Sequence, residues 1–159
     1  MYIMYLHHTI FSIVFLQNKI LGGDKKLSKW THIAGIIRID HFPLGTTPLV
    51  ESEAEGIISE GSPSGSEGGL TFIANRTQVI RPSGFDLVWG SVSFVGDLRD
   101  FSIEQLPKIV KWLKEIPERL NKRSSMIREA IVSVDFEEPE EERIFTFDLD
   151  KGEWKEIKT

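Results

Sequence analysis

The sequence contains no cysteine among its 159 residues. Disulfide bonds, thiolate metal sites and cysteine nucleophiles are therefore excluded, and the composition favours an intracellular setting. An excess of basic residues is also missing, because the formal net charge is −5 at pH 7. General nucleic-acid binding is not expected, since neutralising phosphates requires a positively charged surface.

The N-terminal segment lacks the pattern of a targeting sequence. No lysine or arginine precedes Lys19, whereas a secretory signal begins with a basic region. The apolar run is also shorter than the roughly 20 residues that a helix needs to span a bilayer. Residues 21–24 can be encoded by TTAGGAGGAGAT, which contains a bacterial ribosome-binding sequence, and Leu27 by the alternative start codon TTG. We therefore expect residues 1–26 to be an upstream extension, with a leader segment as the alternative, and residues 27–159 to form one domain.

Apolar residues recur at spacings that predict five strands and two helices. The predicted strands cover residues 30–40, 70–81, 85–95, 127–136 and 143–149, and residues 154–157 add a short edge. The first predicted helix covers residues 48–60 and begins at Thr47-Pro48. The second starts near residue 106, preceded by a capping box of Ser102 and Gln105, and Pro117 ends or kinks it.

This order of elements predicts an α+β fold of the ferredoxin-like class, a β-α-β-β-α-β sandwich with an extra C-terminal strand. Both helices cover one face of the sheet, and the strands lie in the spatial order 5-4-1-3-2. In that topology, strands 1 and 2 begin where strands 3 and 4 end. Segments that are distant in sequence should therefore meet at one end of the sheet.

The segments expected at this end carry the candidate ligand-binding residues. They are the N-terminal part of the first strand, the Gly/Ser-rich stretch of residues 61–69, and the polar turn expected after Gly96. The candidate residues are Trp30, His32, Ser66, Glu67, Gly68, Asp97, Arg99 and Asp100. A guanidinium, flexible glycine backbone and the amides of a helix N-terminus suit a small anionic or polar ligand.

Each of these features also has a purely structural interpretation. The stretch GSPSGSEGG lacks the Lys-Ser/Thr pair that makes a phosphate loop specific, and such stretches usually only connect. Arg99 between Asp97 and Asp100 can be a local ion pair that fastens the turn. His32 can be a satisfied polar residue, and the acidic segment 137–142 a solvated hairpin tip.

A catalytic constellation is not evident in the sequence. No set of residues matches a nucleophile, a base and an orienting group. Asp97 and Asp100 could contribute to a divalent-cation site, but two carboxylates three residues apart are a weak signal because hard cations need more oxygen ligands. We expect no bound cofactor and no resident metal.

Three stretches, WTHIAGIIRID (residues 30–40), GSEGGL (65–70) and FVGDLRDFS (94–102), resemble small accessory proteins of tailed phages and prophages of Firmicutes. The resemblance spans about residues 28–149 and implies a phage gene expressed in the host bacterial cytoplasm. Such proteins often neutralise a host component, as in counter-defence. Two functions remain open: a non-enzymatic binder of a host protein or of an anionic nucleotide-type ligand, and a small metal-dependent nuclease or phosphodiesterase.

The C-terminal edge of the predicted sheet indicates self-association. An extra edge strand with an exposed Trp154 would leave backbone groups that need covering. We expect a homodimer, because closed two-fold assemblies are the commonest oligomers.

Overall fold

The computed structural model describes residues 28–42, 49–80 and 86–157, and the side chains of residues 77–80 and 86–89 are not described within them. The expected upstream extension and the helix start at Thr47-Pro48 lie outside the described residues.

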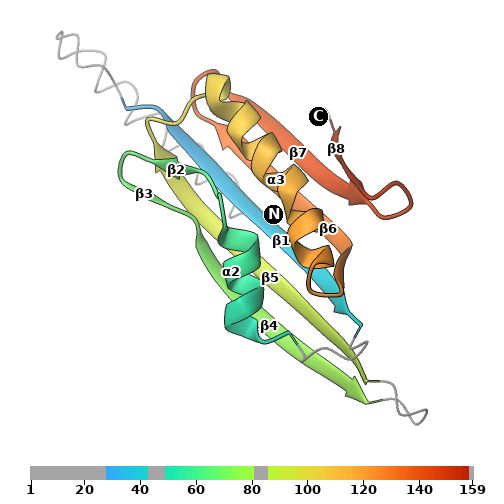
Figure 1. Cartoon of the computed structure of the whole chain (residues 1–159). Helices are drawn as coiled ribbons and strands as arrows, with labels where there is room; N and C mark the ends of the chain where they lie inside the picture. Colours follow the sequence, from blue (N-terminus) through green and yellow to red (C-terminus); the bar gives the residue numbers. More distant parts are fainter. Residues whose placement is uncertain (1–27, 43–48, 81–85, 158–159) are drawn as a thin grey trace, which may run out of the picture.

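Six strands form one antiparallel sheet in the order β4-β5-β1-β6-β7-β8 (Figure 1). The central strand β1 (Trp30–His41) pairs with β5 (Asp86–Arg99) on one side and β6 (Ser125–Phe136) on the other. The outer strands are β4 (Thr71–Ile80), β7 (Glu141–Asp148) and β8 (Glu153–Ile157). The predicted α+β class, with two helices and a large antiparallel sheet, is confirmed.

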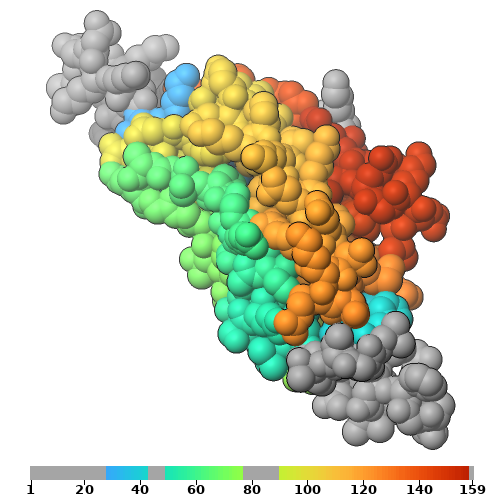
Figure 2. Space-filling view, viewed as in Figure 1, coloured from blue at the N-terminus to red at the C-terminus, as the bar shows by residue number. Residues whose placement is uncertain are grey.

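Two α-helices, α2 (Glu51–Ser59) and α3 (Leu106–Asn121), cover the same face of the sheet (Figure 1). A short 3-10 helix, η1 (Ile103–Gln105), precedes α3. In the space-filling view the two helices lie side by side across this face, and β7 and β8 (red) emerge beside α3 (Figure 2). No helix within the described ranges is long and apolar enough to cross a membrane.

The core lies between the helices and the facing side of the sheet. Every second residue of a strand is buried there, because successive side chains point to opposite faces and the helices cover only one face. The largest fully buried side chains are Trp112, Phe101, Phe136, Ile33, Ile37, Ile58, Leu98, Ile109, Leu113, Ile116, Leu120 and Ile127. Phe94 and Phe72 meet the Trp112 ring edge-on, with centroid distances of 5.2 and 6.4 Å.

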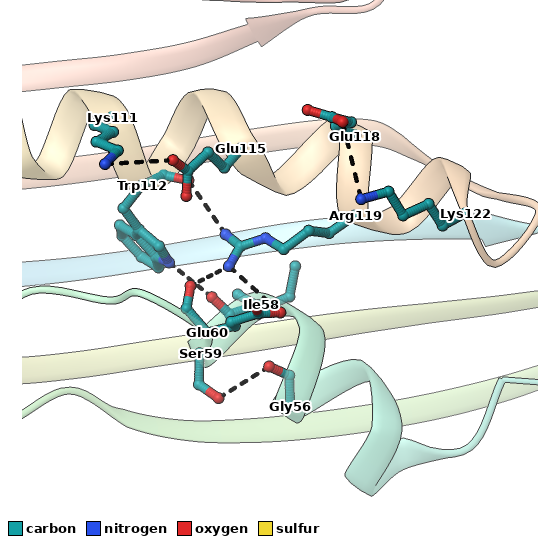
Figure 3. A network of polar contacts seen from close by, with 10 residues as sticks. All are labelled: Gly56, Ile58, Ser59, Glu60, Lys111, Trp112, Glu115, Glu118, Arg119 and Lys122. Atoms are coloured by element: carbon teal, nitrogen blue, oxygen red, sulfur yellow. Dashed lines mark hydrogen bonds and ion pairs between the residues drawn. The ribbon is translucent and has the colours of Figure 1, made fainter.

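Polar groups join the two helices above this core (Figure 3). The Trp112 indole N–H donates to the Ile58 carbonyl over 2.7 Å, which satisfies both groups in a buried position. The Arg119 guanidinium donates to the carbonyls of Glu60 and Trp112 and so closes the C-terminal end of α2. These contacts fix the separation of the helices.

Several predicted boundaries are wrong. The third strand does not stop at Gly96 but continues through Arg99, so Asp97 and Arg99 belong to β5 rather than to a turn. The Gly/Ser-rich stretch of residues 61–69, expected to be a loop, contains a short hairpin. Its two strands, β2 (Ser64–Gly65) and β3 (Gly68–Gly69), have two residues each. The first helix begins at Glu51 rather than at residue 48.

The start and interior of α3 bear on two further expectations. The capping interaction is present, because the Gln105 side chain accepts a hydrogen bond from the Ser102 N–H over 3.0 Å. Pro117 does not end the helix, which continues through Asn121. Its neighbours Ile116 and Leu120 are fully buried, so packing holds the last turn in place despite the missing donor.

Leu113 tests how α3 is docked. Its side chain is fully buried against the sheet, so Leu113→Ala should lower the free energy of unfolding by about 2–5 kcal/mol through cavity formation. The matched control is Leu149→Ala, because Leu149 is 39% exposed; a change within about 0.5 kcal/mol is expected there. Urea denaturation of the full chain measures both. Equal costs for the two variants would contradict the docking of α3.

Candidate functional site

Strand register brings the predicted site residues to one end of the sheet. Trp30 lies opposite Arg99, and His32 lies between Asp97 on β5 and Asp135 on β6. The β2–β3 hairpin packs on the end of β5, where the Ser66 N–H donates to the Arg99 carbonyl over 2.9 Å. We call this region the loop–turn end. It is formed by the hairpin, the start of β1, the end of β5 with the residues from Asp100 to Glu104, and the residues that follow β6.

The β2–β3 hairpin packs directly against the backbone at the end of β5. A Cβ atom on Gly65 would lie 2.5 Å from the Arg99 carbonyl oxygen, so only glycine fits there. The Ser66 hydroxyl donates to the Asp100 carboxylate over 2.7 Å. Asp100 has a φ of +59°, and its N–H donates to the Lys29 carbonyl over 2.7 Å. The turn after β5 is therefore fixed by the hairpin on one side and by the residues before β1 on the other.

Arg99 is held by three neighbours. Its Nε donates to the Ser28 hydroxyl over 2.9 Å, and its Nη1 pairs with the Glu67 carboxylate. The guanidinium carbon lies 6.0 Å from the centroid of the Trp30 ring, within the range of a cation–π contact. These contacts match the structural interpretation of Arg99, with Glu67 rather than Asp97 or Asp100 as the ionic partner.

His32 bridges two carboxylates. Its Nδ1 lies 2.7 Å from Asp97 Oδ1 and its Nε2 lies 3.4 Å from Glu137 Oε1. Burial lowers the pKa of His32, but the hydrogen bonds to Asp97 and Glu137 and their negative charge outweigh it and raise the pKa above its ordinary value. The protonated ring donates from both nitrogens, which satisfies both carboxylates.

The loop–turn end is acidic. Its exposed carboxylates are Glu67, Asp97, Asp100, Glu104, Glu137 and Glu138. The cations that pair with them in the described part of the chain are Arg99, Lys29 and, when protonated, His32. The hydrogen bond from the Ser102 hydroxyl lowers the pKa of Glu104, so that this carboxylate is ionised at neutral pH. The local field therefore attracts cationic groups and repels anions.

Seven of the eight predicted residues are linked by contacts at this end. The exception is Gly68, which lies in the same hairpin at a φ of +127°, with open space around it. Ser28, Lys29, Glu104, Glu137 and Glu138 also contribute to this end and were not among the predicted site residues. Glu137 was assigned to a solvated tip, yet its N–H donates to the Trp30 carbonyl over 3.1 Å. Glu137 directly follows a strand that ends at this edge of the sheet, and this position in the sequence could have identified it as a site residue.

The acidic groups do not converge on one point. Asp97 and Glu137 contact different nitrogens of the His32 ring and therefore lie on different sides of it. Among the described residues, no group of three or more histidine or acidic side chains is placed to hold a metal ion.

A separate hollow of about 740 Å³ lies beside the loop–turn end, on η1 and the first half of α3. Ile103, Leu106 and Val110 supply its apolar wall, and each is partly exposed. Glu104 lies on its margin together with Lys111 and Lys114. An apolar patch therefore adjoins the acidic surface.

No protein-family model matches the chain, and no curated protein matches it. A solved structure described as a phage SAM lyase in complex with S-methyl-5'-thioadenosine is similar at 19% sequence identity and a TM-score of 0.34. The match covers 81% of this chain and 90% of that chain. A similarity this low carries no argument about fold or activity.

The raised pKa of His32 predicts a pH dependence of stability. The protonated ring stabilises the folded state fully below the pKa of an unfolded histidine, and the effect disappears as pH rises through the higher folded-state pKa. The free energy of unfolding of the wild type relative to His32→Gln should therefore be highest below the ordinary histidine pKa of about 6.5 and fall as the pH rises from there through the higher folded-state pKa. The change should stay below about 1 kcal/mol, because the side chain is 43% exposed.

The comparison with His32→Gln is needed because His41 titrates in the opposite sense. Burial and the nearby charges of Arg123 and Arg76 lower the pKa of His41, so its contribution is lost as pH falls. The wild type and His32→Gln both retain His41, so subtracting their free energies of unfolding removes the effect of His41. A difference that is constant across this pH range would show that His32 is not held by the two carboxylates.

Proposed function

We propose that this chain is a phage-encoded, non-enzymatic binding protein that engages a basic surface of a host protein through the loop–turn end, in the manner of a counter-defence factor. The phage origin and the host cytoplasm as location rest on the resemblance of its three sequence stretches. The observation that carries the binding role is the acidic surface at the loop–turn end. There, Arg99 is already paired and most carboxylates remain exposed.

The arrangement suits recognition of a protein. The hairpin, the turn and β1 are cross-linked by hydrogen bonds, so the carboxylates are presented on a fixed backbone. Pre-organisation of this kind reduces the entropy lost on binding. The hollow beside Ile103, Leu106 and Val110 adds apolar area next to the charged groups, the combination of core and rim that protein interfaces use.

An anionic nucleotide-type ligand is less well supported. Such a ligand would have to displace Glu67 from Arg99, and it would do so among the carboxylates of Asp97 and Asp100. Removing a phosphate from water into a field of its own sign is unfavourable. The metal-dependent nuclease is the alternative with the least support, since the acidic side chains of the loop–turn end do not point at a common centre.

We also infer that the domain belongs to the ferredoxin-like class. The elements β1-α2-β4-β5-α3-β6 follow the β-α-β-β-α-β order, and their strands lie in the order β4-β5-β1-β6. In this interpretation β7 and β8 are additions to the edge of the sheet beside β6.

Charge reversal at the acidic surface tests the proposed function. Glu104→Lys/Glu138→Lys alters two exposed carboxylates of the loop–turn end, and Glu118→Lys/Glu153→Lys is the matched control with two exposed carboxylates at the other end of α3 and on β8. Each tagged protein is used to capture proteins from a lysate of the bacterial host, with quantitative mass spectrometry. We expect a partner with a basic surface to be retained by the wild type and the control, weakened about tenfold by the first variant, and released by salt.

The same purified proteins also distinguish the proposed function from the two alternatives. A nucleotide bound in stoichiometric amount and lost in Arg99→Gln would replace this proposal with ligand sequestration. Degradation of nucleic acid that requires added Mg²⁺ or Mn²⁺ would replace it with the nuclease. Equal capture by both double variants would place the working surface elsewhere.

A further inference from the structure

The face of the sheet opposite the helices is apolar, and no segment within the described ranges covers it. Among the described residues, five large apolar side chains on this face are exposed by 44–58%. They are Ile36, Ile73, Val95, Ile131 and Ile157. Contiguous exposed apolar area of this kind marks an interaction surface.

Strand register arranges the residues of this face in rows that cross the sheet. The first apolar row is Thr71, Val95, Ala34, Ser133, Ile144 and Ile157. The second apolar row is Ile73, Ser93, Ile36, Ile131, Thr146 and Lys155. The two rows are adjacent, since their members are two residues apart on every strand.

Large and small side chains alternate between the two rows. On β1 the pair is Ala34 and Ile36, and on β6 it is Ser133 and Ile131. On β4, β5 and β7, likewise, one row carries isoleucine or valine and the other serine or threonine. Turning one copy over about an axis that runs across the strands, between the two rows, would place every large residue of these strands opposite a small one.

We propose that a second copy of this chain covers the helix-free face, related by that two-fold axis. Packed sheets interdigitate their inner side chains in this way, and an isologous contact needs one self-complementary surface. In the proposed dimer Ile36 of each copy lies over Ala34 of the other. The interface goes beyond the proposed host-binding function and does not depend on it.

The outer rows carry charged residues, and the same axis brings Arg38 to acidic groups of the second copy. The acidic row is Asp97, His32, Asp135 and Glu142, and the arginine row is Asn75, Ser91, Arg38 and Glu129. The same two-fold axis places the acidic row of one copy over the arginine row of the other. Arg38 then faces the second copy's His32 and lies between the second copy's Asp97 and Asp135. Glu129, which pairs with Arg38 in its own copy over 4.0 Å, comes opposite the second copy's Asp135, so the favourable contact is centred on Arg38 and Asp97.

The size of the face matches what a stable dimer needs. Two rows span six strands and two span four, and strands about 4.8 Å apart with rows about 7 Å apart then give about 670 Å². That area lies within the range of about 600–1,000 Å² that each partner contributes to an interface of standard size. A hollow of about 690 Å³ on this face, lined by Ile36, Arg38 and Ile131 among others, leaves room for side chains of the second copy.

The edge strand is a poorer candidate for self-association. Trp154 is not the exposed residue that the sequence led us to expect, because it is half-buried and packs edge-on against Phe147 at 5.6 Å. Its neighbours Glu153, Lys155 and Glu156 line β8 with charges, which disfavour edge-to-edge pairing.

Sedimentation equilibrium of the full chain tests the proposal. We expect a dimer in the wild type, and Ile36→Asp should weaken it about 30-fold or more, because it places a charge at the centre of the apolar rows. Val50→Asp is the matched control, since Val50 is 45% exposed and precedes α2 on the other side of the sheet. Unchanged thermal unfolding of both variants confirms that they remain folded.

Mixing two variants tests the two-fold register itself. Arg38→Asp and Asp97→Arg each create like-charge contacts in a homodimer and should each weaken it about tenfold. A mixture restores both charge pairs, so native mass spectrometry should show the heterodimer in preference to either homodimer. Statistical mixing would overturn the proposed axis.

Three further outcomes would overturn the proposal. One is a wild-type monomer at all concentrations. Another is a full chain that dimerises only after residues 1–27 are removed, which would assign the face to that segment. The last is a monomer whose binding of a host protein is lost in Ile36→Asp but retained in Glu104→Lys/Glu138→Lys, which would assign the face to the host partner. The host-binding proposal fails independently, through the latter variant alone.

Discussion

The pairing of β1 along both of its edges is the constraint on which the rest of this structure depends. Because β5 and β6 both bind β1 over nearly its whole length, the register of three central strands is fixed at once. A shift by one residue would move Ile33 and Ile37 from the core to solvent. The same register places Arg99 beside Trp30 and His32 between two acidic strands.

One consequence is a strong asymmetry between the two faces of the sheet. The two helices both pack on one face of the sheet, where Trp112 and Arg119 link them by hydrogen bonds. Neither helix therefore covers the other face. Isoleucine occurs on both sides of β1, at Ile37 under the helices and at Ile36 on the helix-free face. A central strand that is apolar on both sides is typical of a sheet that is covered twice. In the proposed dimer the second copy supplies that second cover.

Much of this arrangement could be predicted from the sequence, because it depends on local periodicity. The alternation in β1 and the helical stripe that contains Leu113 and Leu120 predicted the strand, the helix and their buried sides. The convergence at the loop–turn end followed from topology alone. Whether the residues gathered there bind a ligand remains a prediction.

The parts that could not be predicted depend on contacts between distant segments. The glycine at position 96 suggested that the strand ends there. In the structure the strand continues past Gly96, and the glycine is needed because a Cβ atom would collide with Gly69 and Leu70. The sequence suggested that Arg99 pairs with its acidic neighbours, but Asp97 is bound to His32 and Asp100 to Ser66, and the hairpin supplies Glu67 as the partner of Arg99. Only the folded hairpin reveals that the guanidinium is already neutralised.

The central claim is that the helix-free face is buried against a second copy while the hollow at Ile103 and the neighbouring carboxylates Glu104 and Glu138 stay accessible. Hydroxyl-radical footprinting of the full chain across a range of concentrations tests it residue by residue. The account predicts that Ile36, Val95 and Ile131 lose reactivity together as concentration rises, while Val50 and Ile103 keep theirs. Reactivity of Ile36, Val95 and Ile131 that is independent of concentration, or protection that appears first at Ile103, would contradict it.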